Sequence, residues 1–139
     1  MEFSRRDTMA MGLGAAALTV LPMRAFATAT DDAIAAFTGG AEMADTGLTL
    51  TAPEIAENGN TVPIEVSAPG ASAIMVLATG NPTPPVATFN FGPLAASQSA
   101  STRIRLAGTQ DVVAIAKMTD GSFARATSTV KVTIGGCGG

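Results

Sequence analysis

The sequence predicts an all-β, immunoglobulin-like antiparallel β-sandwich of about seven strands, with one short N-terminal helix and a flexible C-terminal arm. Two observations predict the sandwich: apolar residues recur at every second position, and turn residues interrupt this alternation about every ten residues. The arm is predicted because the chain ends in Gly-Gly-Cys-Gly-Gly, around its single cysteine. A length of 139 residues fits one domain.

The N-terminus has the composition of an export signal. Arg5-Arg6 precedes a short apolar run at residues 8–21, and Ala25-Phe26-Ala27 offers a small-x-small cleavage site. Paired arginines favour the twin-arginine (Tat) route. The run is shorter than the roughly 20 residues that a membrane-spanning helix needs. We therefore expect residues 1–27 to be a cleaved twin-arginine-type signal peptide, and the mature protein to be periplasmic and free of the membrane.

After the expected cleavage site, residues 31–37 predict the short helix. Asp31 and Asp32 at its start would suit the positive end of the helix dipole, and Ile34 and Phe37 would share one face. The pair Gly39-Gly40 predicts the end of this helix.

Residues 28–134 are expected to form the sandwich domain. Strands are predicted at 48–51, 62–67, 73–78, 87–91, 103–106, 112–118 and 123–134. Asp120-Gly121 predicts a hairpin between the last two strands, and Pro63 predicts that its strand lies at an edge or a bulge. The segment Asn81-Pro82-Thr83-Pro84-Pro85, which contains three prolines, predicts a rigid loop.

The expected core is built mainly from valine, isoleucine and leucine. Its predicted members are Ile64, Val66, Ile74, Val76, Phe89, Phe91, Ile104, Leu106, Val130 and Val132. Because aromatic residues make up only 4% of the chain, this core should be modest in depth. We therefore expect a partner subunit to cover part of the apolar surface.

Composition excludes several classes of function. The chain has no histidine and one cysteine, so it lacks a Ser-His-Asp or Cys-His pair, an imidazole metal ligand and a thiolate cluster. We expect no catalytic residue, no metal and no cofactor, and thus no enzyme acting alone. Without residues 1–27 the chain keeps five scattered basic and nine acidic side chains, which predicts no binding of nucleic acid.

Cys137 is the candidate site. It lies in the segment 135–139, where Gly135, Gly136, Gly138 and Gly139 would give the backbone a flexible hinge and clearance. Five extended residues reach roughly 17 Å. A free thiol has a pKa of about 8.5, and no neighbouring cation in the sequence activates this one. We expect Cys137 to be a passive point of covalent attachment, with an intermolecular disulfide as the alternative role.

The Gly-Gly-Cys-Gly-Gly terminus, behind a small β-domain and a twin-arginine-like signal, resembles the SoxY family of sulfur-substrate carriers. This family belongs to the periplasmic thiosulfate-oxidising (Sox) pathway. Further segments are similar to the family: Phe37-Thr38-Gly39-Gly40, Pro53-Glu54-Ile55-Ala56-Glu57-Asn58-Gly59, Val62-Pro63-Ile64, Asn81-Pro82 and Phe89-Asn90-Phe91. The resemblance implies that Cys137 holds thiosulfate-derived intermediates covalently and presents them to partner enzymes.

The resemblance also implies partners. It implies a heterodimer with a SoxZ-type subunit, and transient contacts with a SoxAX-type cytochrome, a SoxB-type hydrolase and, in many organisms, a sulfur dehydrogenase. The main alternative is an exported immunoglobulin-like binding or scaffold module, whose cysteine only forms an intermolecular disulfide. A thiol oxidoreductase is a weaker alternative, because the chain has no second, resolving cysteine.

Overall fold

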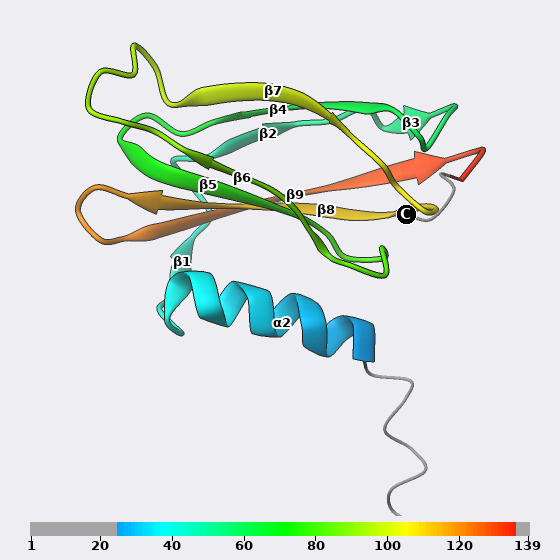
Figure 1. Cartoon of the computed structure of the whole chain (residues 1–139), viewed down its shortest axis with the longest axis horizontal. Helices are drawn as coiled ribbons and strands as arrows, with labels where there is room; N and C mark the ends of the chain where they lie inside the picture. Colours follow the sequence, from blue (N-terminus) through cyan, green and yellow to red (C-terminus); the bar gives the residue numbers. More distant parts are fainter. Residues whose placement is uncertain (1–24, 136–139) are drawn as a thin grey trace, which may run out of the picture.

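The computed structural model describes residues 25–135, which form one helix and two β-sheets (Figure 1). In chain order the elements are α2 (Ala25–Thr38), β1 (Met43–Ala44), β2 (Thr49–Thr51), β3 (Ile55–Ala56), β4 (Val62–Ser67), β5 (Ala71–Ala78), β6 (Pro85–Asn90), β7 (Ser99–Ile104), β8 (Gln110–Met118) and β9 (Phe123–Val132). The larger sheet has the order β1-β9-β8-β5-β6, with β3 also pairing with β9, and the smaller sheet has the order β2-β4-β7. The predicted fold class, an antiparallel β-sandwich with one short helix, is confirmed.

Each predicted strand segment overlaps an observed strand, but two strands were not predicted. β1 and β3 are two residues long and run parallel to β9, where they pair with its start and its end. Two residues are too few to show an alternating pattern, so only the tertiary structure reveals them. The boundaries of β7 were also wrong: this strand runs from Ser99 to Ile104, because all six of its residues pair with β4, from Ser67↔Ser99 to Val62↔Ile104.

α2 begins at Ala25 rather than at Asp31, so the two aspartates lie in its middle and not in its first turn. The residues before Asp31 alternate alanine with phenylalanine and threonine, and alanine has the highest helix propensity. The predicted end is confirmed: the Gly39 N–H donates to the Ala35 carbonyl at 2.7 Å, and Gly39 and Gly40 both have positive φ angles. In the part of the chain described, no helix combines the length and apolarity required to cross a membrane.

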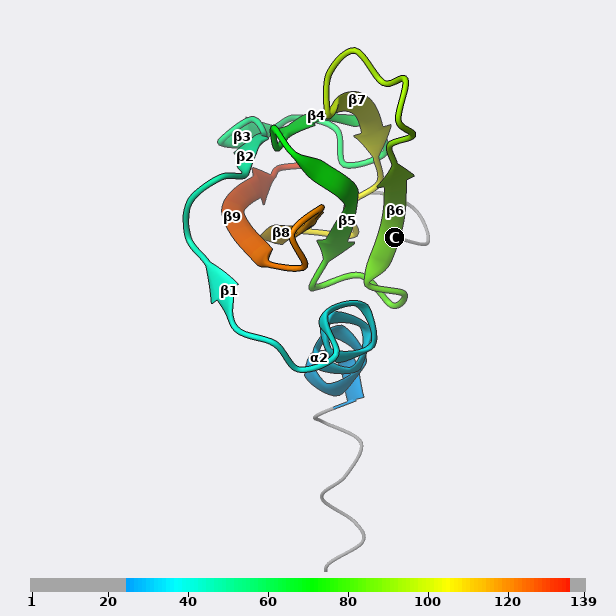
Figure 2. The ribbon, with the colours of Figure 1, turned by 90° about the vertical axis from the view of Figure 1, so that its left-hand side faces the viewer.

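The helix covers the outer face of the larger sheet (Figure 2). Ile34 and Phe37 lie on the face predicted for them, and the Phe37 ring meets Phe123 edge-on at a centroid distance of 6.1 Å. The buried members of this second cluster are Met75, Leu77, Val113, Ile115 and Phe123. Because β5 and β8 are buried on both faces, their sequences are continuous apolar runs and do not alternate.

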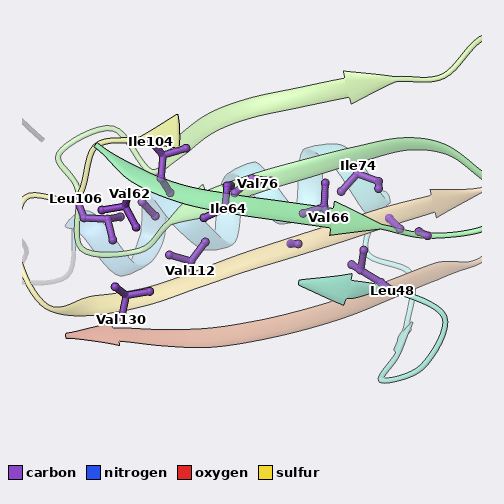
Figure 3. Packing of buried hydrophobic residues seen from close by; sticks show 14 of the residues in the cluster. Leu48, Val62, Ile64, Val66, Ile74, Val76, Ile104, Leu106, Val112 and Val130 are labelled. Carbon is purple, nitrogen blue, oxygen red and sulfur yellow. The ribbon is translucent and has the colours of Figure 1, made fainter. Parts of the chain in front are cut away.

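The main core lies between the two sheets (Figure 3). Its buried members include seven of the predicted residues: Ile64, Val66, Ile74, Val76, Ile104, Leu106 and Val130. The prediction was wrong for Phe89, Phe91 and Val132, which are only partly buried against this core. Phe89 lies on β6, an edge strand that pairs only with β5, and Val132 lies beyond Val130, the last residue of β9 that pairs with β8.

The prediction that the strand of Pro63 lies at an edge was wrong, because β4 is the middle strand of the smaller sheet. At Pro63 itself, however, only β7 has a register partner, Arg103. β2 pairs with β4 only from Glu65 to Ser67. The proline therefore lies where the β2 side of the ladder is open, and its missing N–H is tolerated there.

Candidate functional site at the root of the C-terminal arm

The structure describes the place where the predicted arm leaves the sandwich. Cys137 and the predicted arm residues Gly136, Gly138 and Gly139 lie outside the described residues, so their predicted roles stay predictions. Gly135 is described and follows directly on the last residues of the β9 side of the sandwich. We call the segment 133–135 the arm root.

The loop around β3 holds one side of the arm root. Backbone pairing continues past Val132, because the Thr133 N–H donates to the Ala56 carbonyl at 3.0 Å and the Gly59 N–H donates to the Ile134 carbonyl at 2.7 Å. The Thr133 hydroxyl adds a hydrogen bond to the Glu57 carbonyl at 3.0 Å. These bonds continue the backbone pairing two residues beyond β9.

The loop 105–109, between β7 and β8, holds the other side. The Val132 N–H donates to the Thr109 hydroxyl oxygen at 2.9 Å. A Cβ atom added at Gly135 would clash with the backbone carbonyl oxygen of Ala107, so the chain passes this loop at a distance that only glycine permits. The requirement for glycine comes from space, because the φ angle of Gly135 is not in the left-handed region.

Two buried side-chain amides, of Asn81 and Gln110, hold the loop 105–109 in place. Asn81 is 1% exposed; its Nδ2 donates to the Arg105 carbonyl at 2.8 Å, and its Oδ1 accepts the Ala107 N–H at 2.9 Å. The Gln110 Nε2 donates to the Asn81 Oδ1 at 2.9 Å and to the Gly108 carbonyl at 3.0 Å. Each amide is thereby satisfied, as buried polar groups must be.

Gly59 joins the two sides of the arm root. Its N–H donates to the Ile134 carbonyl, and its own carbonyl accepts the N–H of the fully buried Leu106 at 2.8 Å. The arm root, the loop around β3 and the loop 105–109 therefore form one hydrogen-bonded unit at a single end of the sandwich. Figure 1 shows the ends of β7 and β9 at this same end.

Sequence reasoning missed most of this unit. Asn81 was predicted only as part of a rigid loop, and Gln110 was not predicted to have a role. The sequence feature that could have pointed to these roles is an amide side chain close to the end of each of two apolar strands, β5 and β8. Nothing in that spacing says that the two amides meet, because they are 29 residues apart in the sequence.

Within residues 25–135, no three Asp, Glu, His or Cys side chains lie close enough together to hold a metal ion. A surface groove of about 530 Å³ on the outer face of the smaller sheet contains one acidic and one basic side chain, Glu65 and Arg103, beside its other lining residues. A single carboxylate does not form the paired acid and base that hydrolysis needs.

Comparison with known proteins assigns the family. The model of the family described as sulfur oxidation protein SoxY matches residues 34–137. This chain belongs to the SoxY family. The match begins on the helix face that packs against the sheet and extends to Cys137, so it includes the whole described sandwich and the arm root of this SoxY-family chain. The resemblance seen in the sequence is confirmed.

Among solved structures, this SoxY-family chain is similar to the sulfur carrier protein SoxY from Chlorobium limicola f thiosulfatophilum. The two are 40% identical with a TM-score of 0.67, and the similarity covers 78% of this chain and 99% of that chain. No curated protein matches the chain.

More distant structures share the fold alone. A superoxide reductase (neelaredoxin) from Ignicoccus hospitalis is 20% identical with a TM-score of 0.54, over 63% of this chain and 80% of that one. The hypothetical protein PH1083 from Pyrococcus horikoshii OT3 is 12% identical with a TM-score of 0.53, over 68% and 99%.

Proposed function

We propose that this SoxY-family chain is a sulfur-substrate carrier of a periplasmic thiosulfate-oxidising pathway, and that it holds thiosulfate-derived intermediates covalently on Cys137. The observation that carries the proposal is the family match, which extends through the arm root to Cys137. The 40% identity to a sulfur carrier protein supports it. The anchored arm root supports it too, because an arm that presents cargo needs a fixed origin.

The proposed chemistry balances without a catalytic group on this chain. The Cys137 thiol and thiosulfate form a new S–S bond, giving a cysteine S-thiosulfonate, one proton and two electrons. A SoxAX-type cytochrome accepts the electrons. A SoxB-type hydrolase then adds water, which releases sulfate and two protons and leaves a persulfide anion (Cys–S–S⁻) on Cys137. A sulfur dehydrogenase is the further enzyme that consumes this sulfane sulfur. The chain itself is a non-catalytic carrier in this scheme.

The proposed partners need a surface near the arm root. Ile134 and Ile55 are 67% and 59% exposed, and both lie at this end of β9, since Ile55 pairs with Lys131. Exposed branched aliphatic side chains next to the arm provide apolar contacts for a partner enzyme. We propose a SoxZ-type subunit as the stable partner, in a heterodimer, and the pathway enzymes as transient partners.

The proposed location is the periplasm, reached by the twin-arginine route. Cleavage after Ala27 would remove the first three residues of α2 and would keep Ile34 and Phe37, which contact the sheet. The cleaved chain therefore retains the contacts that hold the helix. Intact mass of the protein from its native periplasm tests this: we expect a chain beginning at Thr28, and an uncleaved chain would contradict the signal peptide.

Cys137→Ser tests the function directly. In a reconstituted thiosulfate-oxidising system we expect complete loss of activity, with the circular dichroism spectrum and the melting temperature unchanged. A matched variant combines Cys137→Ser with Thr127→Cys, which moves the thiol to an exposed position on β9. This variant should stay inactive, because the thiol no longer lies on the arm. Activity in either variant would refute the proposal.

Intact-mass spectrometry separates carriage from the disulfide alternative. Protein isolated during thiosulfate oxidation should carry a thiosulfonate or additional sulfur atoms on Cys137, and reductant should remove them. A mass that shows only disulfide-linked chains would favour a binding or scaffold module instead.

A further inference from the structure

We propose that Asn81 and Gln110 are positioning residues for the carrier arm: they fix the loop 105–109, and this loop holds Gly135, so that the arm always starts from one point. The inference rests on the proposed function of Cys137 as the carrier thiol. It adds residues outside the arm that determine where the thiol can go.

The first step is that the hydrogen bonds of the two amides favour one conformation of the loop 105–109. Asn81 contacts the loop at both Arg105 and Ala107, and Gln110 contacts it at Gly108. The Gln110 Oε1 also accepts the Gly80 N–H at 2.9 Å, which ties the network to the turn after β5. A buried amide that lost these bonds would be left with unsatisfied polar atoms, so the network favours a single loop conformation.

The second step is the contact between this loop and the arm root. The Ala107 carbonyl lies against Gly135, and the Ala107 N–H is the group that Asn81 binds. A displacement of Ala107 would therefore displace the carbonyl group that Gly135 contacts. On the opposite side, Gly59 bonds to both Ile134 and Leu106, so the loop and the arm root share a second link.

The third step is the short distance from the arm root to the thiol. Cys137 is two residues beyond Gly135, so the two Cα atoms lie within about 7 Å of each other. If the arm root moved, the starting point of this short segment would shift by a distance comparable to the length of the segment itself. Productive contact with an enzyme depends on such placement at the ångström scale.

The experiment measures the position of Cys137 without using activity. Nitroxide labels are attached to Cys137 and to a second cysteine at Thr127→Cys, and pulsed dipolar EPR gives the distribution of distances between them. The extended chain from Thr127 to Gly135 is roughly 26 Å long, and the two further residues to Cys137 keep the distance between the labels within the range of the method. With Asn81→Ala we expect a broader distribution with a shifted mean. Gly135→Ala should shift the mean because its methyl group displaces the root from Ala107.

Two controls keep the test decisive. Ile115→Ala also removes buried contacts, but on the face of β8 that packs against α2, so it should lower the melting temperature and leave the distribution unchanged. Gly135→Ala lies at the end of the described chain, so it reports on the root even if Asn81→Ala fails to fold. Unchanged distributions in the folded variants would overturn the inference, as would equal broadening in Ile115→Ala.

The two proposals fail in different ways. If Cys137→Ser keeps its activity, the carrier function is wrong, whatever the EPR distances show. If Cys137→Ser is inactive and the Asn81 and Gly135 variants leave the distances unchanged, the carrier function stands and the positioning role is wrong.

Discussion

At the scale of single residues, Asp120 shows how a turn is stabilised at the end of the sandwich opposite the arm root. Its carboxylate accepts hydrogen bonds from the Ser122 hydroxyl at 2.6 Å and from the Ser122 N–H at 2.8 Å. Gly121 completes the predicted β8–β9 hairpin with a positive φ of 88°. The Ser122 hydroxyl first, and its N–H second, hold the pKa of Asp120 below its ordinary value of 3.8.

This lowered pKa predicts a pH dependence of stability. Because the folded-state pKa of Asp120 is below the unfolded value, its contribution is present above the unfolded pKa and is lost as the pH falls through the folded pKa. We expect Ser122→Ala to raise the pKa of Asp120 toward 3.8 in a carboxyl NMR titration. Thr127→Ala, at an exposed position on β9, should leave the titration unchanged. An Asp120 pKa that does not respond to Ser122→Ala would contradict this account.

The glycines in and around the arm root differ in how clearly the sequence shows their roles. The glycines of the terminal pentapeptide stand out because the motif is local. The need for glycine at Gly135 has a cause that is not local, since the clashing atom belongs to Ala107. Gly59 was visible only as a turn residue, and its role as a double bridge depends on two segments that meet in the folded state.

At the scale of elements, α2 is the feature whose importance the sequence understated. Its apolar pair, Ile34 and Phe37, was predicted, and so was its end at Gly39. The surface that it covers was not predicted, because the apolar runs of β5 and β8 do not say which face meets a helix and which meets a sheet. The helix gives the larger sheet a second core.

Phe37→Ala tests the value of this packing. Phe37 is partly buried and meets Phe123 edge-on, so we expect the free energy of unfolding to fall by about 2 kcal/mol, less than for a fully buried phenylalanine. Urea denaturation measures the change. Ala36→Ser, at an exposed position of the same helix, should change the stability by less than about 0.5 kcal/mol. A Phe37 variant as stable as the Ala36 variant would show that the helix is only loosely attached.

At the scale of the whole molecule, the arrangement of the sheets predicts a gradient of local stability. β5 and β8 are interior strands of the larger sheet, and both of their faces are buried. β1 and β3 are two-residue strands at its margin. Local opening is rarest where burial and hydrogen bonding are greatest.

Amide hydrogen exchange tests this gradient. We expect the slowest exchange in β5 and β8, at rates set by global unfolding, and the fastest in β1 and β3. The buried Gly59, whose amide donates to Ile134, reports on the arm root and should exchange more slowly than the neighbouring exposed Asn60, whose N–H donates to the exposed Asn58 side chain. Uniform protection along the chain would contradict the gradient, and rapid exchange at Gly59 would contradict an anchored root.

By itself, the sequence determined the local features of this protein: the strand segments, the hairpin at Asp120-Gly121, the end of the helix and the cysteine on a glycine-rich terminus. Each follows from residues that are near one another in the chain. Only the tertiary structure decided that α2 covers the larger sheet, that β1 and β3 pair with β9, and that Asn81, Gln110 and Gly59 hold the arm root. These contacts join residues that are far apart in the chain, as Phe37 and Phe123 are, and such contacts leave no periodic trace in the sequence.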